Sequence, residues 1–256
     1  MKRYLIYMAA ILLTAMAGTA HAQKKFSFDL KEHNIEFEVK AAFSIGGTSP
    51  LPLPEEIRSI KGYNPTLALS LGAQVTKWFD NSKWGFSSGI SFDNKAMKTK
   101  ADVKSYKMEI NYGKGPIKGY WTGMVQTTVD NSYFTIPFLA AYKFTPSWNL
   151  RFGPYVAFLI DKGFSGYVYD GYLRQDDPTG PKVTIDSDQT ASYNFSSDLN
   201  KFQYGLQAGG SWKMNRHFRV FGDLQWGLND VFKSDFETIS FNMYNIYLNM
   251  GFGYIF

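Results

Sequence analysis

The stretch YNIYLNMGFGYIF, residues 244–256, decides the fold class because apolar residues alternate with small or polar ones up to the last residue. A repeat of two residues predicts a β-strand with one apolar face. The strand ends on Phe256, and an aromatic ring at a strand end is typical of a membrane–water boundary. The apolar face carries Tyr244, Ile246, Leu248, Met250, Phe252, Tyr254 and Phe256.

The same alternation recurs along the chain, so we predict eight strands. The other seven lie near residues 35–45, 66–79, 84–93, 133–144, 149–160, 201–212 and 218–228. Short and long connections alternate between them. Residues 80–83, 145–148 and 214–217 are tetrapeptide turns, whereas residues 46–62, 94–131, 163–200 and 229–240 are long. This order indicates an all-β fold, an eight-stranded antiparallel up-and-down transmembrane β-barrel with short periplasmic turns and long extracellular loops.

Two other architectures fit part of the pattern. A soluble antiparallel barrel would turn the apolar face inward. Large aromatics near the strand ends favour a membrane barrel instead, because they resemble the girdles at its two boundaries. These predicted membrane-boundary aromatics are Trp78, Trp84, Trp212, Trp226, Tyr254 and Phe256. Alternation through residues 105–129 further suggests a hairpin that turns near residues 113–116 beyond the membrane, and counting it in the barrel gives a ten-stranded alternative.

The N-terminus reads as a signal peptide over residues 1–22. Lys2 and Arg3 precede an apolar stretch, and Ala20-His21-Ala22 is an A-x-A cleavage site. We therefore expect a mature barrel domain over residues 23–256, with both termini in the periplasm of a bacterial outer membrane. The chain contains no cysteine, which excludes disulfides and thiolate metal sites.

The segment YFTIPFLAAYKFTPSWNLRFGPYVAFLI, residues 133–160, resembles the central block of the PorT-like outer-membrane barrels of Bacteroidetes. An apolar segment with proline, then YKF, a tight turn and GPY carry the resemblance. The end of the chain, from DLNKFQYGLQAGGSW at residue 198 to YLNMGFGYIF, is similar to the same family. The resemblance implies an eight-stranded outer-membrane barrel. One founding member serves a secretion system, but most relatives have no assigned role, so no role is implied.

The residues do not indicate an enzyme. His33 and His217 are predicted on the periplasmic side, whereas barrel enzymes generally use a histidine near the external rim or the membrane boundary. Glu36 and Glu38 share a strand face with Lys40, which favours structural pairing. No GxSxG, HExxH or phosphate-binding loop occurs. We expect no catalytic residue, metal or cofactor, and the mild positive charge does not indicate nucleic-acid binding.

Function is expected in the external loops, since loops on a rigid scaffold often carry it. The second loop is basic, with Lys95, Lys98, Lys100, Lys104, Lys107, Lys114 and Lys118, and the third is acidic, with Asp170, Asp176, Asp177, Asp186, Asp188 and Asp198. The loops could pair, or the lysines could contact lipopolysaccharide phosphates. We predict a non-enzymatic scaffold or interaction protein. The alternative is a component of an envelope transport or secretion assembly, or a narrow channel.

The expected partners are outer-membrane lipid and lipopolysaccharide, the barrel-assembly machinery that would recognise Phe256, and an envelope protein of unknown identity. Eight strands enclose a space that side chains fill. Face assignment sends charges of both signs into that lumen, where they must pair. The predicted polar network consists of Glu36, Glu38, Lys40, Lys143, Arg151, Arg219 and Asp223.

Overall fold

The computed structural model describes residues 32–113 and 115–256, and these residues form an antiparallel all-β fold. The predicted signal peptide lies outside them. No helix among the described residues is long and apolar enough to cross a membrane. The strands are β1 (Ile35–Pro50), β2 (Ile57–Asn64), β3 (Ala68–Trp78), β4 (Trp84–Tyr112), β5 (Gly115–Lys143), β6 (Trp148–Asp161), β7 (Phe164–Gln175), β8 (Lys182–Ile185), β9 (Ala191–Asn194), β10 (Phe202–Lys213), β11 (Phe218–Gly227) and β12 (Met243–Ile255), with a 3-10 turn at Ser196–Asp198.

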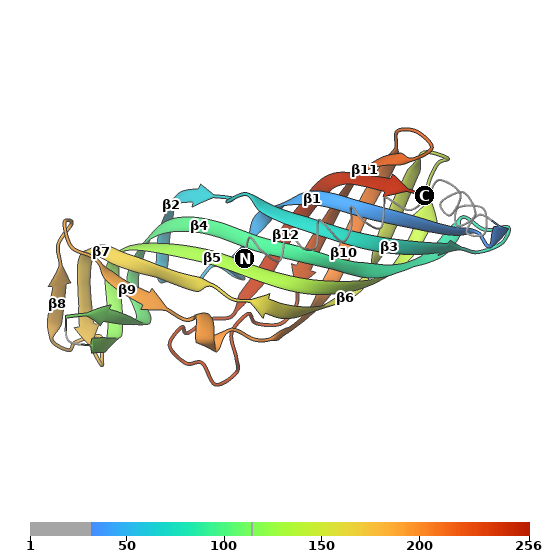
Figure 1. The fold of residues 1–256 in the computed structure, drawn as a ribbon. Coiled ribbons are helices and arrows are strands. Elements are labelled where there is room, and N and C mark those ends of the chain that lie inside the picture. Colours follow the sequence, from blue (N-terminus) through green and yellow to red (C-terminus); the bar gives the residue numbers. More distant parts are fainter. Residues whose placement is uncertain (1–31, 114) are drawn as a thin grey trace.

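Eight of the described strands pair in a closed ring. Its order is β1, β3, β4, β5, β6, β10, β11 and β12, and β12 pairs back onto β1. These are the eight strands that the alternation predicts, in the predicted sequential order (Figure 1). Closure removes the open edges that an unpaired sheet would present. The hairpin over residues 105–129, which the ten-stranded alternative counted as two more strands, continues β4 and β5 and adds no strand to the ring.

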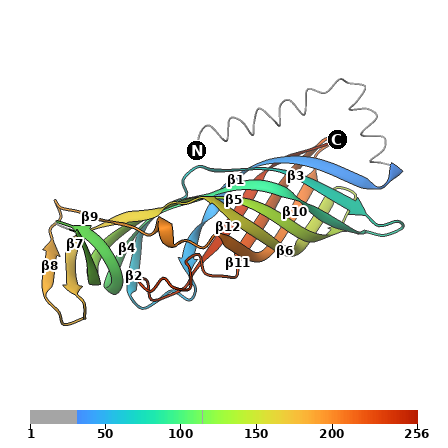
Figure 2. The ribbon, with the colours of Figure 1, turned by 60° about the horizontal axis from the view of Figure 1, so that its bottom comes forward.

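Strands β4 and β5 are each 29 residues long and continue past the ring as a hairpin. β4 ends at Tyr112 and β5 begins at Gly115, so the turn predicted near residues 113–116 is present. Beyond the ring, β2 pairs with β4, β7 pairs with β5, and β8 and β9 both pair with β7. We call these four strands and the outer halves of β4 and β5 the extension. Figure 2 shows it at the end of the molecule opposite the C-terminus.

The extension corrects the prediction that residues 94–131 and 163–200 are long loops, since most of these residues lie in strands. A pair of bulges allows its sheet to curl. Ser105 has a φ of 55° beside an irregularity between Val103 and Tyr106, and Gly123 opposite has a φ of 141°. Bulges bend strands and increase their twist. The curled sheet brings β9 to the hairpin tip, where Ser192 pairs with Asn111.

The extension has its own apolar core. Its inner face is contributed by β4, β5, β7, β8 and β9, and residues 228–242 with the start of β12 cover the open side. The buried members include Met97, Val103, Met108, Ile110, Trp121, Val125, Val129, Phe164, Val168, Leu173, Ile185, Tyr193, Val231, Phe232, Ile239 and Met243. Burial of apolar area on this scale stabilises a folded unit, so the extension is a structured module.

Candidate functional site: the polar lumen

A buried ion-pair network occupies the ring near the end that carries the C-terminus. Arg219 on β11 bonds Glu36 at 2.7 Å and Glu38 at 2.8 Å, both on β1. Arg151 on β6 lies 3.7 Å from Glu38 and 3.1 Å from Asp223. Lys40 closes the set by donating to Asp223 at 2.6 Å. These six predicted residues therefore form one connected network across the interior.

The two-residue period of the strands positions these groups. Glu36, Glu38 and Lys40 alternate along β1, so all three side chains point inward. Glycines opposite them leave the space that the carboxylates occupy. A Cβ on Gly253 would overlap the Glu38 carboxylate, and a Cβ on Gly209 would overlap that of Asp223. The small residues of the inner face thus make room for charged side chains from neighbouring strands.

Two predicted site residues lie elsewhere. Trp78 does not face outward: it shares the inner face of β3 with Gln74 and Thr76 and is only 6% exposed. Lys143 is not part of the ion network, because its ammonium lies 4.2 Å from the centre of the Trp78 ring. The two form a cation–π contact at the ring end near the tetrapeptide turns. The alternation predicted the inward direction of Lys143 but gave no information on its partner.

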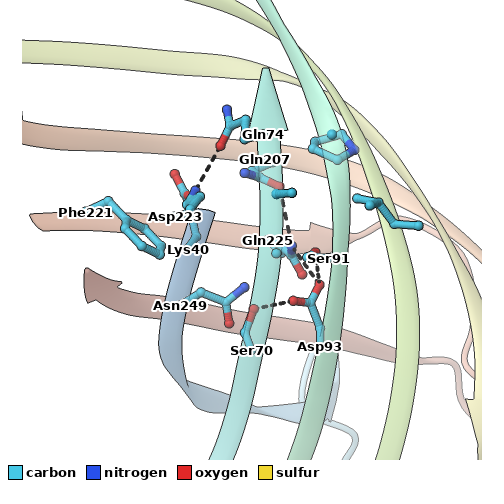
Figure 3. A pocket seen from close by; sticks show the side chains of 15 residues that line it. Lys40, Ser70, Gln74, Ser91, Asp93, Gln207, Phe221, Asp223, Gln225 and Asn249 are labelled. Carbon is cyan, nitrogen blue, oxygen red and sulfur yellow. Dashed lines mark hydrogen bonds and ion pairs between the residues drawn. The ribbon is translucent and has the colours of Figure 1, made fainter. Parts of the chain in front are cut away.

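A small cavity of about 40 Å³ lies beside the network (Figure 3). Asp93 forms one side of it and accepts hydrogen bonds from Ser70 at 2.5 Å, Ser91 at 3.0 Å and Gln225 at 3.4 Å. Lys40 and Asp223 line the opposite side. A space of this size has room for one to three water molecules at about 15 Å³ each.

Lys95 is a site residue that the sequence reasoning placed wrongly, in the basic external loop. Its side chain points into the interior and is 1% exposed. Its ammonium lies 5.1, 5.5 and 5.7 Å from the ring centres of Tyr133, Tyr155 and Tyr247. The inward direction of Lys95 could have been predicted from the sequence, because Lys95 follows Asp93 by two residues and so shares its strand face. Lys114, from the same predicted loop, lies outside the described residues.

Polar side chains complete the layer around Lys95. Asn245 on β12 donates to the Tyr133 hydroxyl at 3.2 Å and to Gln203 at 2.6 Å, joining β12 to β5 and β10 across the interior. Thr48 on β1 also donates to Asn245 at 2.6 Å. Bonds in this layer and in the ion network therefore join strands on opposite sides of the ring.

The two faces of β4 and β5 exchange character at this level. Below it the outer face is apolar, with Trp84 and Phe86 paired beside Tyr142 and Ala140. The last apolar outer pair is Phe92 with Phe134, whose rings are 6.0 Å apart. The outer face continues with Asn94, a buried Ala96, Lys98 and Lys100. The inner residues change from Asp93 and Lys95 to Met97, Val103 and Met108. Apolar side chains thus lie outside the ring and inside the extension.

Other aromatic positions behave as the alternation predicts. Trp84, Trp212 and Trp226 are 53, 43 and 47% exposed on the outer face. Tyr254 contacts Phe256 with ring centres 5.0 Å apart, and Phe256 contacts Phe37 at 5.4 Å. The last strand therefore ends in an aromatic cluster at the rim of the ring.

A closed antiparallel ring that is apolar outside and polar inside is the architecture of an outer-membrane β-barrel. Residues 21–233 match the family model described as the outer membrane protein beta-barrel domain, and the chain belongs to that family. It is accordingly an outer-membrane protein. This match does not distinguish the PorT-like subgroup from the rest of the family.

The structure is also similar to solved barrels. The attachment invasion locus protein Ail of Yersinia pestis has 11% identity, covers 87% of this chain and 97% of its own, and superposes with a TM-score of 0.37. Neisserial surface protein A has 12% identity over 87% and 97% of the two chains, with a TM-score of 0.34. OprG of Pseudomonas aeruginosa has 15% identity over 86% and 95%, with a TM-score of 0.29. No curated protein matches the chain. Likenesses this distant carry no inference about function.

Proposed function

We propose that this protein is a non-enzymatic outer-membrane scaffold that presents its extension outside the cell as an interaction surface. The exchange of faces along β4 and β5 carries the proposal. A strand that is apolar outside suits lipid, and the same strand with its apolar face inside suits water. We infer that the membrane ends near Asn94 and Ser132, with the extension outside and both termini in the periplasm.

Strand dimensions agree with this placement. From Trp84 to Phe92 the outer face of β4 runs about 27 Å at roughly 3.4 Å per residue, and a tilt of about 40° reduces this to about 20 Å of height, close to the apolar band of about 25 Å in such barrels. From Asn94 to Tyr112 the strand continues for about 60 Å at about 3.3 Å per residue. The extension therefore projects far beyond the lipid headgroups. Lys98 and Lys100 lie near its base and would be the lysines closest to the phosphates of lipopolysaccharide.

The contact region that we favour is a cleft of about 470 Å³ in the extension. Its lining contains Lys107 and Lys118 of the basic segment and Asp176 and Asp198 of the acidic segment, together with Tyr120, Asp235 and Glu237. The two segments of opposite charge thus meet on one surface. Charges arranged in this way favour specific and oriented binding of a protein partner from the envelope.

The narrow-channel alternative is disfavoured by the filled lumen. An ion crossing the ring would have to separate Arg219 from Glu38 and Arg151 from Asp223, and buried pairs are costly to separate. A place in an envelope assembly remains the second candidate, and it makes the same demand for a stoichiometric partner. We expect the barrel-assembly machinery to contact the chain only during biogenesis.

Site-specific crosslinking tests the proposal. A photoreactive residue in place of Tyr120 should capture one defined envelope protein in intact cells, whereas the same residue in place of Asn81, in a turn at the opposite end, should not. Planar-bilayer recordings on the purified protein should show no step conductance. Steady conductance together with no crosslinked partner would contradict the scaffold proposal and favour a channel.

A further inference from the structure

We propose that a groove on the outer face of the ring binds one acyl chain of a phospholipid. The groove has a volume of about 470 Å³ and lies over β10 and β11, with β6 on one side and β12 and β1 on the other. Its lining includes Phe43, Trp148, Trp212, Val220, Met250 and Phe252 around Gly210 and Gly222. It is separate from the lumen and from the extension.

Gly210 and Gly222 create the groove, and the backbone does not require either of them. They pair directly across β10 and β11. A Cβ on Gly210 would have its nearest neighbour at 3.6 Å, and one on Gly222 at 3.9 Å, so both positions have room for a side chain. Neighbouring Gly209 differs, because a Cβ there would overlap Asp223.

Glycine in a strand interior weakens the strand and often marks a close approach by a ligand or another backbone. The inward glycines of this ring have a packing reason in the charged side chains opposite them. For the outward pair, no such reason is found among the described residues. The absence of side chains at Gly210 and Gly222 produces the groove, so we infer that the two glycines serve to shape this surface.

The walls of the groove select the chemistry of its occupant. In register with the glycine pair stand Leu150 on one side and Met250 on the other. Two residues closer to the tetrapeptide turns, Trp148 and Trp212 stack with ring centres 6.5 Å apart. These walls offer hydrocarbon and aromatic surface. A peptide segment in this place would have backbone polar groups without partners in lipid, whereas an acyl chain has none to satisfy.

Position in the ring identifies the source of the acyl chain. Trp148 and Trp212 adjoin the short turns at the end opposite the extension, and Arg216 is exposed in the turn between β10 and β11. With the orientation proposed above, on which this inference rests, that end faces the periplasmic leaflet. A phospholipid there would place its acyl chain in the groove and its phosphate near Arg216, because cationic side chains and interfacial aromatics sit at headgroup level.

Native mass spectrometry of the full-length protein, extracted from membranes in mild detergent, tests the site. The wild type should retain one phospholipid per chain. Gly222→Leu should lower that occupancy by about tenfold, since its side chain fills the groove and removes the apolar contact. The matched control is Ala140→Leu, which adds bulk on the exposed outer face of β5 and should keep the lipid. Arg216→Gln should reduce the preference for anionic over zwitterionic headgroups.

Heat-modified gel mobility of every variant establishes that the ring is folded, so a lost lipid cannot be ascribed to a lost fold. Equal lipid retention by Gly222→Leu and the wild type would overturn the proposal, as would a wild type with no bound lipid. If lipopolysaccharide were retained in place of a phospholipid, the assignment of the groove to the periplasmic leaflet would be wrong. A dimer mass that Gly222→Leu abolishes would make a second copy the occupant. None of these results depends on whether the extension has a protein partner.

Discussion

Replacing Arg219 with alanine should lower the free energy of unfolding by about 3 kcal/mol, because breaking a buried pair leaves an uncompensated charge. The Arg219 side chain is 2% exposed and bonds two carboxylates. Glu36 is 19% exposed and can regain water, but Glu38 is 1% exposed and cannot. After truncation Glu38 would keep one ion pair among the described residues, with Arg151 at 3.7 Å. The stranded Glu38 carboxylate therefore accounts for most of the expected loss.

Urea unfolding of the protein in lipid vesicles, followed by tryptophan fluorescence, would measure this loss. Lys118→Ala is the matched control, since the Lys118–Glu109 pair at 3.4 Å is exposed and should contribute below about 1 kcal/mol. Adding Glu38→Gln to Arg219→Ala should recover most of the stability, because the buried charge is then removed. If Arg219→Ala unfolds at the wild-type urea concentration, the lumen is hydrated and the argument for a filled barrel is wrong.

Three further predictions concern the ends and the core. Deleting Phe256 should reduce the heat-modifiable folded band in cells without changing the fold of the protein once it is folded in detergent; normal assembly would contradict a recognition role for this residue. Trp121→Ala, which removes a fully buried indole from the extension, should destabilise that core by about 3–5 kcal/mol, and should speed amide exchange in β7 but not in β11. Burial raises the pKa of Tyr193, so its stabilising effect is complete below the unfolded value of about 10 and is lost as pH rises above it. Amide protection in the extension, corrected for the base-catalysed intrinsic exchange rate, should therefore fall at alkaline pH, and Tyr193→Phe should reduce that fall.

The alternation predicted the ring because each of its strands separates lipid from a polar interior, which gives a period-two pattern. It also predicted the β4–β5 hairpin of the extension, but not the strands β2, β7, β8 and β9 that pair with it. Past Asn94 the apolar side chains change faces, so a search for one apolar outer face stops there. Lys95 was misplaced for the same reason, since its charge resembled that of a solvated loop.

Partners inside the lumen were harder to predict than directions. The sequence indicates that Glu38, Arg151 and Arg219 point inward, but their pairing depends on how β1, β6 and β11 face each other across the ring. For Trp78 the predicted direction of the side chain was wrong. Its position at a strand end favoured a boundary aromatic, whereas the parity of β3 turns it inward onto Lys143. For the direction of this side chain, the alternation along the strand was a better guide than the preference of tryptophan for membrane boundaries.

The unbroken course of β4 and β5 through the level of Asn94 has a mechanical consequence. Between Ser91 and Val103 every residue of β4 pairs in register with β5, with no bulge. A pull on the hairpin tip would put the backbones of β4 and β5 under tension together, and the hydrogen bonds that join β4 to β3 and β5 to β6 in the ring would resist it in shear. Tension applied tens of ångströms outside the membrane would reach the strand that carries Asp93 and Lys95 with little stretch. The extension is in this sense a stiff lever fixed to the wall of the barrel, and a tether at its tip would be firmly anchored.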